Sequence, residues 1–108
     1  MTPTPARTRM GRRERHDIIL SAALRVACDV GYNRITRDDI AMAAGCSPAL
    51  VSEFFGTMPS LRRTLIRAAI TQRVLPVVAQ ALAIRDPHAL RAPQELRDAA
   101  AAALGARA

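Results

Sequence analysis

At 108 residues the chain has room for one domain, and its 23% charged and 50% hydrophobic residues are typical of a globular protein. Aromatic residues make up only 3%, so the core must be built mainly from small and aliphatic side chains, which suits closely packed helices. The net charge of +7 comes from sixteen basic residues, all of them Arg, against nine acidic ones. Because such a charge attracts polyanions over about a Debye length, roughly 8 Å at physiological salt, nucleic acid is the first candidate partner and an anionic membrane surface the second. No membrane partner is expected, because the Arg residues are spread over several predicted helices and the basic arm lacks bulky apolar anchors.

Residues 1–13 are predicted to form a disordered basic arm, because Pro and Gly interrupt a polar stretch that carries Arg7, Arg9, Arg12 and Arg13. Two interpretations of this arm remain open. It is either a solvated tail or a segment that lies on DNA phosphates or enters a minor groove. Neither a signal peptide nor a membrane-spanning stretch is recognisable, so we expect a cytoplasmic protein.

Three helices are predicted next. Apolar residues recur at spacings of three and four between residues 14 and 30, at Ile18, Ile19, Ala22, Ala23, Val26, Ala27 and Val30, and Gly31 ends this helix. A short second helix begins at Thr36, which forms a capping box with Asp39, and closes at Gly45. Ser47 and Pro48 open a third helix that ends at Phe55.

A fourth helix begins at Pro59 or Ser60, and Pro76 is predicted to kink or break it near residues 71–72. A loop punctuated by Pro87 and Pro93 follows, and a last short helix is predicted for residues 93–104. The expected fold is therefore all-α, with a three-helix helix-turn-helix domain at residues 14–57. Residues 58–108 form a C-terminal helical extension that contains the Pro-interrupted helix.

The two short helices meet the demands of a helix-turn-helix. Ala41 is small enough for the helices to cross closely, and Gly45 can take the left-handed conformation that the turn requires. The third helix then presents its first turns to the major groove, while the start of the second helix contacts the DNA backbone. The predicted DNA contacts are Arg12, Arg13, Thr36, Arg37, Ser47, Pro48, Ala49, Ser52 and Glu53.

The stretch ILSAALRVACDVGYNRITRDDIAMAAGCSPALVSEFFGTMPSL, within residues 13–61, resembles the N-terminal DNA-binding domain of TetR-type transcriptional regulators. The resemblance rests on the order and spacing of Gly31-Tyr32, Ile35-Thr36, residues 39–41, residues 44–47, Phe55 and Leu61. It implies a three-helix domain followed by a long fourth helix. It also implies binding to operator DNA as a dimer, usually to repress transcription.

Several positions depart from the family's pattern. Ser52 and Glu53 stand where aromatic residues are common, Met58 stands where a Lys commonly binds a phosphate, and Gly56 replaces a frequent basic residue. The basic arm, Arg37, Arg62 and Arg63 are candidates to replace these contacts. Glu53 repels phosphates but can accept a hydrogen bond from a cytosine amino group.

The C-terminal extension is shorter than the ligand-binding domain of the family, so a small-molecule inducer is not expected. We expect a homodimer built by apolar residues of this extension, at Leu75, Val77, Val78, Leu82, Ile84, Leu90, Leu96 and Leu104.

No catalytic residues, cofactor or metal site is predicted, because the sequence shows no nucleophile–base set, glycine-rich phosphate loop or metal-ligand spacing. His16 and His88 are interpreted as surface residues. The favoured function is a sequence-specific DNA-binding regulator, with repression expected because it is the family's usual outcome. The alternative is a protein-interaction module on a helix-turn-helix scaffold that has lost specific DNA contacts.

Overall fold

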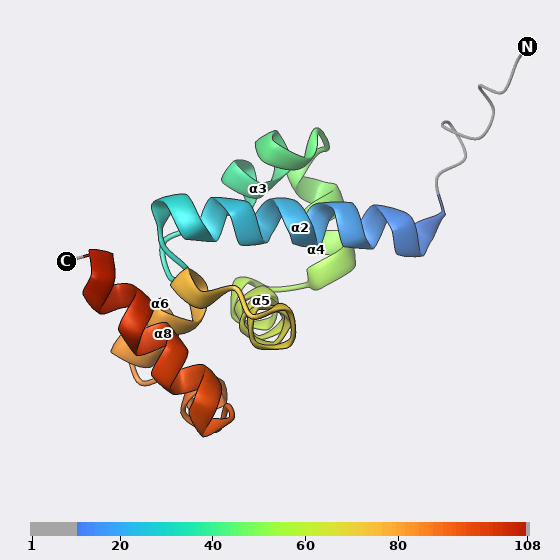
Figure 1. Cartoon of the computed structure of the whole chain (residues 1–108). Coiled ribbons are helices and arrows are strands. Elements are labelled where there is room, and N and C mark those ends of the chain that lie inside the picture. Colours follow the sequence, from blue (N-terminus) through green and yellow to red (C-terminus); the bar gives the residue numbers. More distant parts are fainter. Residues whose placement is uncertain (1–10, 108) are drawn as a thin grey trace, which may run out of the picture.

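The computed structural model describes residues 11–107, and all regular structure within that range is helical. The helices are α2 (Arg12–Val30), α3 (Arg37–Ala44), α4 (Pro48–Phe55), α5 (Met58–Gln72), α6 (Leu75–Ala83), α7 (Pro87–Leu90) and α8 (Gln94–Arg107). In Figure 1, α3 lies on one side of α2 and α5 on the other, α4 runs across α2 between them, and α6 and α8 cross beyond α5. The expected all-α fold is confirmed.

The first described helix begins earlier than expected. Gly11 is its extended N-cap residue, and Arg12 and Arg13 lie in the first turn of α2 instead of in an arm without regular structure. Arg is a good helix former, and Glu14 places a negative charge near the positive end of the helix dipole, so both favour the earlier start. Residues 1–10, with Arg7 and Arg9, lie outside the described residues.

The buried stripe of α2 is rotated relative to the predicted one. Ile18 and Val30 remain 41% and 45% exposed, whereas Leu24 is buried. The reason is that α2 is covered from two sides, because α3 contacts one flank and both α5 and α6 contact another. Leu24 faces α5 and α6. The periodicity of α2 by itself does not reveal that these two helices cover it.

The helix breaks follow the expected local chemistry. Helix α5 ends at Gln72 because Arg73 takes a left-handed conformation (φ 57°), and α6 restarts with Pro76 in its first turn. The break near residues 71–72 is confirmed, and it separates two helices instead of kinking one. The loop expected around Pro87 contains one helical turn, α7, whose first N–H groups donate to the side chain of Asp86.

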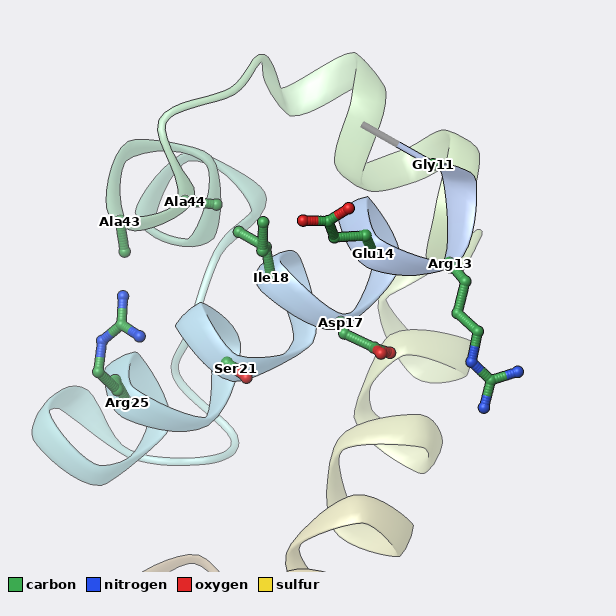
Figure 2. Close-up of a pocket in the computed structure, with 9 residues that line it drawn as sticks. All are labelled: Gly11, Arg13, Glu14, Asp17, Ile18, Ser21, Arg25, Ala43 and Ala44. Atoms are coloured by element: carbon green, nitrogen blue, oxygen red, sulfur yellow. The ribbon is translucent and has the colours of Figure 1, made fainter. Parts of the chain in front are cut away.

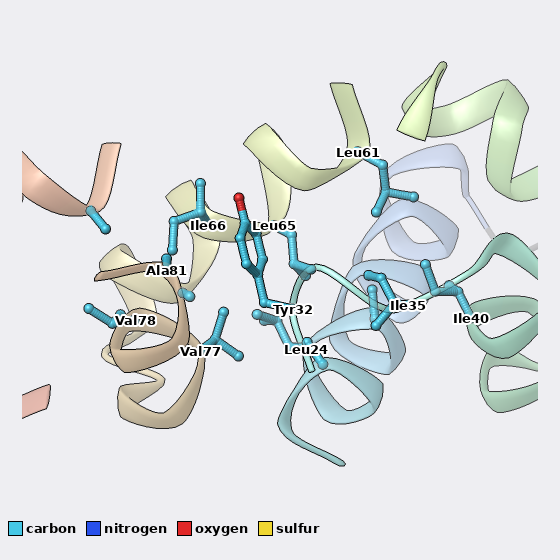
Figure 3. Packing of buried hydrophobic residues seen from close by; sticks show 14 of the residues in the cluster. Leu24, Tyr32, Ile35, Ile40, Leu61, Leu65, Ile66, Val77, Val78 and Ala81 are labelled. Atoms are coloured by element: carbon cyan, nitrogen blue, oxygen red, sulfur yellow. The ribbon is translucent and has the colours of Figure 1, made fainter. Parts of the chain in front are cut away.

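One continuous core joins the first helices to the last (Figure 3). It extends from Ile40 on α3 through Leu65 on α5 to Val78 on α6. This core corrects part of the predicted dimer surface, because Val77, Val78 and Leu96 are at most 2% exposed within a single chain. They pack where α6, α8 and α5 meet, so they are not available to a second copy. Ile84 and Leu90 are exposed, at 50% and 39%.

Candidate nucleic-acid interface

Helices α3 and α4 are joined by a turn that depends on Gly45. Its backbone is left-handed (φ 73°, ψ 37°), and the N–H groups of Gly45 and Cys46 both donate to the carbonyl oxygen of Ala41. Ala41 itself is 3% exposed, so the two helices approach each other over its methyl group. The small residue and the glycine that the sequence assigned to this turn therefore occupy the expected places.

The start of α3 is held by a complete capping box. The N–H of Asp39 donates to Thr36 Oγ1 at 3.1 Å, and the N–H of Thr36 donates to Asp39 Oδ2 at 3.1 Å. Thr36 remains exposed, so its hydroxyl proton is available to an outside acceptor such as a phosphate oxygen.

Arg37 follows Thr36 but is less free than expected. Its Nη2 donates to the carbonyl oxygen of Gly56 at 3.4 Å, which ties the start of α3 to the end of α4. Its Nε is buried and has no hydrogen-bond partner among the described residues. The side chain is therefore half-buried between the two helices, with part of its guanidinium already engaged.

Helix α4 has one buried and one exposed side. Val51 and Phe55 are buried, and the side chain of Ser47 caps the helix by accepting a bond from the N–H of Leu50 at 3.1 Å. On the other side Pro48, Ala49 and Glu53 are exposed and Ser52 is half-buried. The predicted contacts on α4 thus lie on one accessible side of the helix. Pro48 and Ala49, in its first turn, have small side chains.

Arg12 and Arg13 reach this region from the first turn of α2. Arg12 Nη1 lies 3.5 Å from Glu53 Oε2, and its guanidinium carbon lies 4.5 Å from the centroid of the Phe54 ring. Arg13 is exposed and has no ion pair within residues 11–107. The structure therefore brings Arg12 beside Glu53 but gives the two neighbouring arginines different surroundings.

The sequence interpretation missed the aromatic contacts beneath Arg12. The ring of His16 lies 4.9 Å from that of Phe55 and 6.1 Å from that of Phe54, and its Nδ1 is 3.0 Å from Asp17 Oδ1. The His16 side chain is 38% exposed, so it lies at the surface as expected while one face of its ring packs against the two Phe rings. Its spacing of three residues from the buried Ile19 is the signal that places it on the same side of α2 as that core residue.

Helix α5 begins at Met58, one residue before the earlier of its two predicted starts, because Thr57 Oγ1 caps it by accepting from the N–H of Ser60 at 3.2 Å. Arg62 and Arg63 follow in the next turn. Arg63 is exposed, while Arg62 is half-buried and its Nε has no hydrogen-bond partner among the described residues. Arg63 is therefore the more accessible of the two candidates for a phosphate contact.

A groove of about 740 Å³ lies in the corner between α2 and the end of α3 (Figure 2). Among its lining residues, Glu14, Asp17, Ile18 and Arg25 come from α2, and Ala43 and Ala44 from α3. All the lining residues except Ala44 are exposed, so the groove is open to solvent along its length. It is therefore a surface depression and not an enclosed ligand site.

Neither a metal site nor a membrane-spanning helix is found in the part of the chain that the structure describes. Within residues 11–107 there is no group of three or more His, Cys, Asp or Glu side chains placed to hold a metal ion. In the same residues, none of the helices combines the length and the apolar character needed to cross a bilayer.

Comparisons with known proteins find similarity in the region that contains α3 and α4. The sequence profile of the family described as "Bacterial regulatory proteins, tetR family" matches residues 19–65, from α2 into α5. A curated relative, the HTH-type transcriptional regulator BetI of Rhizobium meliloti (strain 1021), is 36% identical over 74 residues. That alignment covers 68% of this chain and 36% of BetI, so the chain spans about a third of this relative's length. No solved structure gives a significant match.

Proposed function

We propose that this chain, whose residues 19–65 match the family profile of the tetR bacterial regulatory proteins, is a transcriptional regulator that binds a specific DNA operator. The main support for the proposal is that one side of α4 is buried in the core and the other side is exposed. Val51 and Phe55 anchor one side in the core, while Pro48, Ala49 and Glu53 stay exposed beside the capped start of α3. A short helix held this way can enter a major groove without losing its packing.

The surrounding charges support a DNA partner. Arg13 and Arg63 are exposed on the helices that flank α4, and the whole chain carries a net charge of +7. Thr36 adds an accessible hydroxyl at the start of α3. In this proposal the arginines and Thr36 contact phosphates and set the position of the domain, and α4 contacts base edges.

We further propose that the chain acts as a homodimer on a pseudo-palindromic operator and represses transcription. A single helix-turn-helix has few base contacts, and two-fold symmetry doubles them on a symmetric site. Repression is what the family resemblance implies for a regulator bound at its operator.

The proposal is tested by selecting binding sites from a pool of random DNA duplexes with the purified chain at about 150 mM salt. The expected result is an enriched inverted repeat whose half-site centres are separated by about 10 base pairs or a multiple of that spacing. Transcription in vitro from a promoter that carries the selected site should then decrease when the protein is added.

The outcome that would contradict the proposal is a folded protein that enriches no sequence and binds all duplexes alike. That result would favour the alternative of a protein-interaction module on a helix-turn-helix scaffold. An increase of transcription would retain operator binding but reject repression.

A further inference from the structure

A carboxylate lies on the surface that the proposed function assigns to DNA. Glu53 is exposed on α4, one turn after Ala49, and its side chain is 60% exposed. An uncompensated negative charge at this place would repel the phosphates on either side of a major groove. The binding surface therefore needs a positive group close to Glu53.

Arg12 supplies that group from a distant part of the sequence. Its Nη1 lies 3.5 Å from Glu53 Oε2, although the two residues are 41 positions apart. Its guanidinium also lies over the Phe54 ring, with the central carbon 4.5 Å from the ring centroid. Guanidinium groups are attracted to aromatic faces at such distances, so Arg12 is held by two independent contacts to adjacent residues of α4.

The ring of Phe54 is itself held in place by neighbouring aromatic rings. Its ring is half-buried and lies 6.1 Å from the ring of His16, which in turn lies 4.9 Å from the ring of the buried Phe55. The second turn of α2 and the last turn of α4 therefore share a small aromatic cluster, and the guanidinium of Arg12 covers its outer side. This support restricts where Arg12 can place its charge.

We infer that Arg12 is a positioning and specificity-determining residue that neutralises Glu53, and not a ligand of the DNA backbone. The inference rests on the proposed function. With Arg12 in place, Glu53 Oε2 is paired and its charge is compensated. Without Arg12, the carboxylate is free to repel phosphates or to accept a hydrogen bond from a cytosine amino group in the major groove.

Arg13 offers a matched comparison on the same turn of α2. It carries the same charge, is exposed, and has no ion pair with any described residue. If Arg13 contacts a phosphate, its loss should lower the slope of log affinity against log salt by about 0.9, whatever residue occupies position 53. The effect of losing Arg12 should instead depend on Glu53.

The experiment is a double-mutant cycle on DNA affinity, measured by fluorescence anisotropy with the duplex that the wild-type chain selects. The variants are R12Q, E53Q and R12Q/E53Q, and the control cycle is R13Q, E53Q and R13Q/E53Q. We expect R12Q to weaken binding about threefold to fivefold more in the wild-type background than in the E53Q background, because exposed charged pairs in contact couple at roughly this level. The R13Q cycle should be additive within about twofold.

Base preference provides a second readout that a purely structural role would not change. A repeated site selection with R12Q should show increased preference for cytosine at one position of each half-site, and this preference should disappear in R12Q/E53Q. R12K should restore most of the affinity, because it restores a positive charge near Glu53. If R12Q fails to fold, the charge-swapped pair R12E/E53R, compared with each single variant, measures the same coupling.

Two results would overturn the inference. An additive R12Q cycle, with the salt slope lowered by about 0.9 in both backgrounds, would show that Arg12 contacts a phosphate directly. Unchanged base preference in R12Q would show that Arg12 does not control Glu53. Failure of the wild-type chain to select any DNA is a different result, because it rejects the proposed function together with everything that depends on it.

Discussion

The phenolic hydroxyl of Tyr32 donates a hydrogen bond to Asp86 Oδ2 at 2.8 Å, across 54 positions of sequence. Tyr32 lies just after α2, and Asp86 caps the first turn of α7. The backbone N–H of Tyr32 also donates to the side chain of Gln80, whose Nε2 donates to the carbonyl oxygen of Ala27 at 3.3 Å. The end of the first helix is therefore joined to the C-terminal helices through polar contacts as well as through the core.

These contacts shift the titration of both partners. Burial, together with the hydrogen bond to Asp86 and the charge of its carboxylate, raises the pKa of Tyr32 above its usual value. Burial alone would raise the pKa of Asp86. The pKa of Asp86 is nevertheless lowered, because burial is outweighed by the hydrogen bond from Tyr32, by the backbone N–H groups of His88 and Ala89, and by the charge of His88. The folded state thus favours a neutral phenol beside an ionised carboxylate.

Replacing Tyr32 by Phe should lower the free energy of unfolding by about 1–3 kcal/mol, because a partly buried charged acceptor loses its donor while the ring still fills the core. Urea unfolding followed by circular dichroism measures the change. Glu95→Gln is the control, because it breaks the exposed ion pair between Arg73 and Glu95 and should change the midpoint little. A Tyr32→Phe midpoint equal to that of wild type would show that the bond does not stabilise the fold.

The same pair should make stability depend on pH in a definite direction. A raised Tyr32 pKa means that stabilisation is lost as the pH rises above about 10, where the unfolded phenol ionises and the folded one does not. A lowered Asp86 pKa means that stabilisation is lost as the pH falls below about 4. Melting temperatures of wild type and Tyr32→Phe should therefore converge at both extremes, and a difference that is constant with pH would contradict this assignment.

Ala49→Glu should abolish specific DNA binding while the melting temperature stays nearly unchanged. Ala49 is exposed on α4, so the new side chain meets solvent in the free protein and the acceptors of DNA in the complex. Because the new carboxylate lies against negatively charged DNA, the affinity for the selected duplex should fall at least roughly 100-fold in anisotropy titrations. Ala102→Glu is the matched control, because it makes the same charge change at an exposed position on α8. Wild-type affinity in Ala49→Glu would show that α4 does not contact base edges.

Phe55→Ala should unfold or strongly destabilise the domain, and Phe54→Ala should not. Phe55 is 7% exposed and lies in the core, so its truncation should cost about 3–5 kcal/mol. Phe54 is half-buried, so losing its ring and its contact with Arg12 should cost roughly 1–2 kcal/mol. Denaturant unfolding of both variants gives the comparison, and equal losses would contradict the difference in burial.

Ile84→Glu should weaken the proposed homodimer without destabilising the monomer. Ile84 is 50% exposed on the C-terminal side of α6, whereas Val77 and Val78 are committed to the core of their own chain. A buried charge at an interface should raise the dimer Kd by about tenfold or more in sedimentation equilibrium. Met42→Glu, at an 84% exposed apolar position on α3, is the control and should leave the Kd unchanged. A wild-type chain that is monomeric at tens of micromolar, both free and on DNA, would reject the dimer itself.

Most of the helix boundaries near the candidate site could be predicted from sequence because they depend on groups within a few residues of each other. The Thr36–Asp39 capping box, the Ser47 cap and the left-handed Gly45 satisfy or release backbone groups of their own turn. The break before Pro76 has the same local origin, since proline lacks the N–H that a continuing helix requires. The family resemblance includes the residues of the Thr36–Asp39 box, Gly45 and Ser47, whereas Pro76 lies outside it.

Which side of each helix faces the core, and which charges meet, depended on the tertiary structure. Periodicity placed Ile18 in the buried stripe of α2, but the packing of α5 and α6 buried Leu24 instead. The pairs Arg12–Glu53 and Tyr32–Asp86 join residues 41 and 54 positions apart, and no local rule specifies such partners. Hydrogen bonds within one helical turn are set by neighbouring residues, whereas side-chain contacts between helices exist only after the chain has packed into one core.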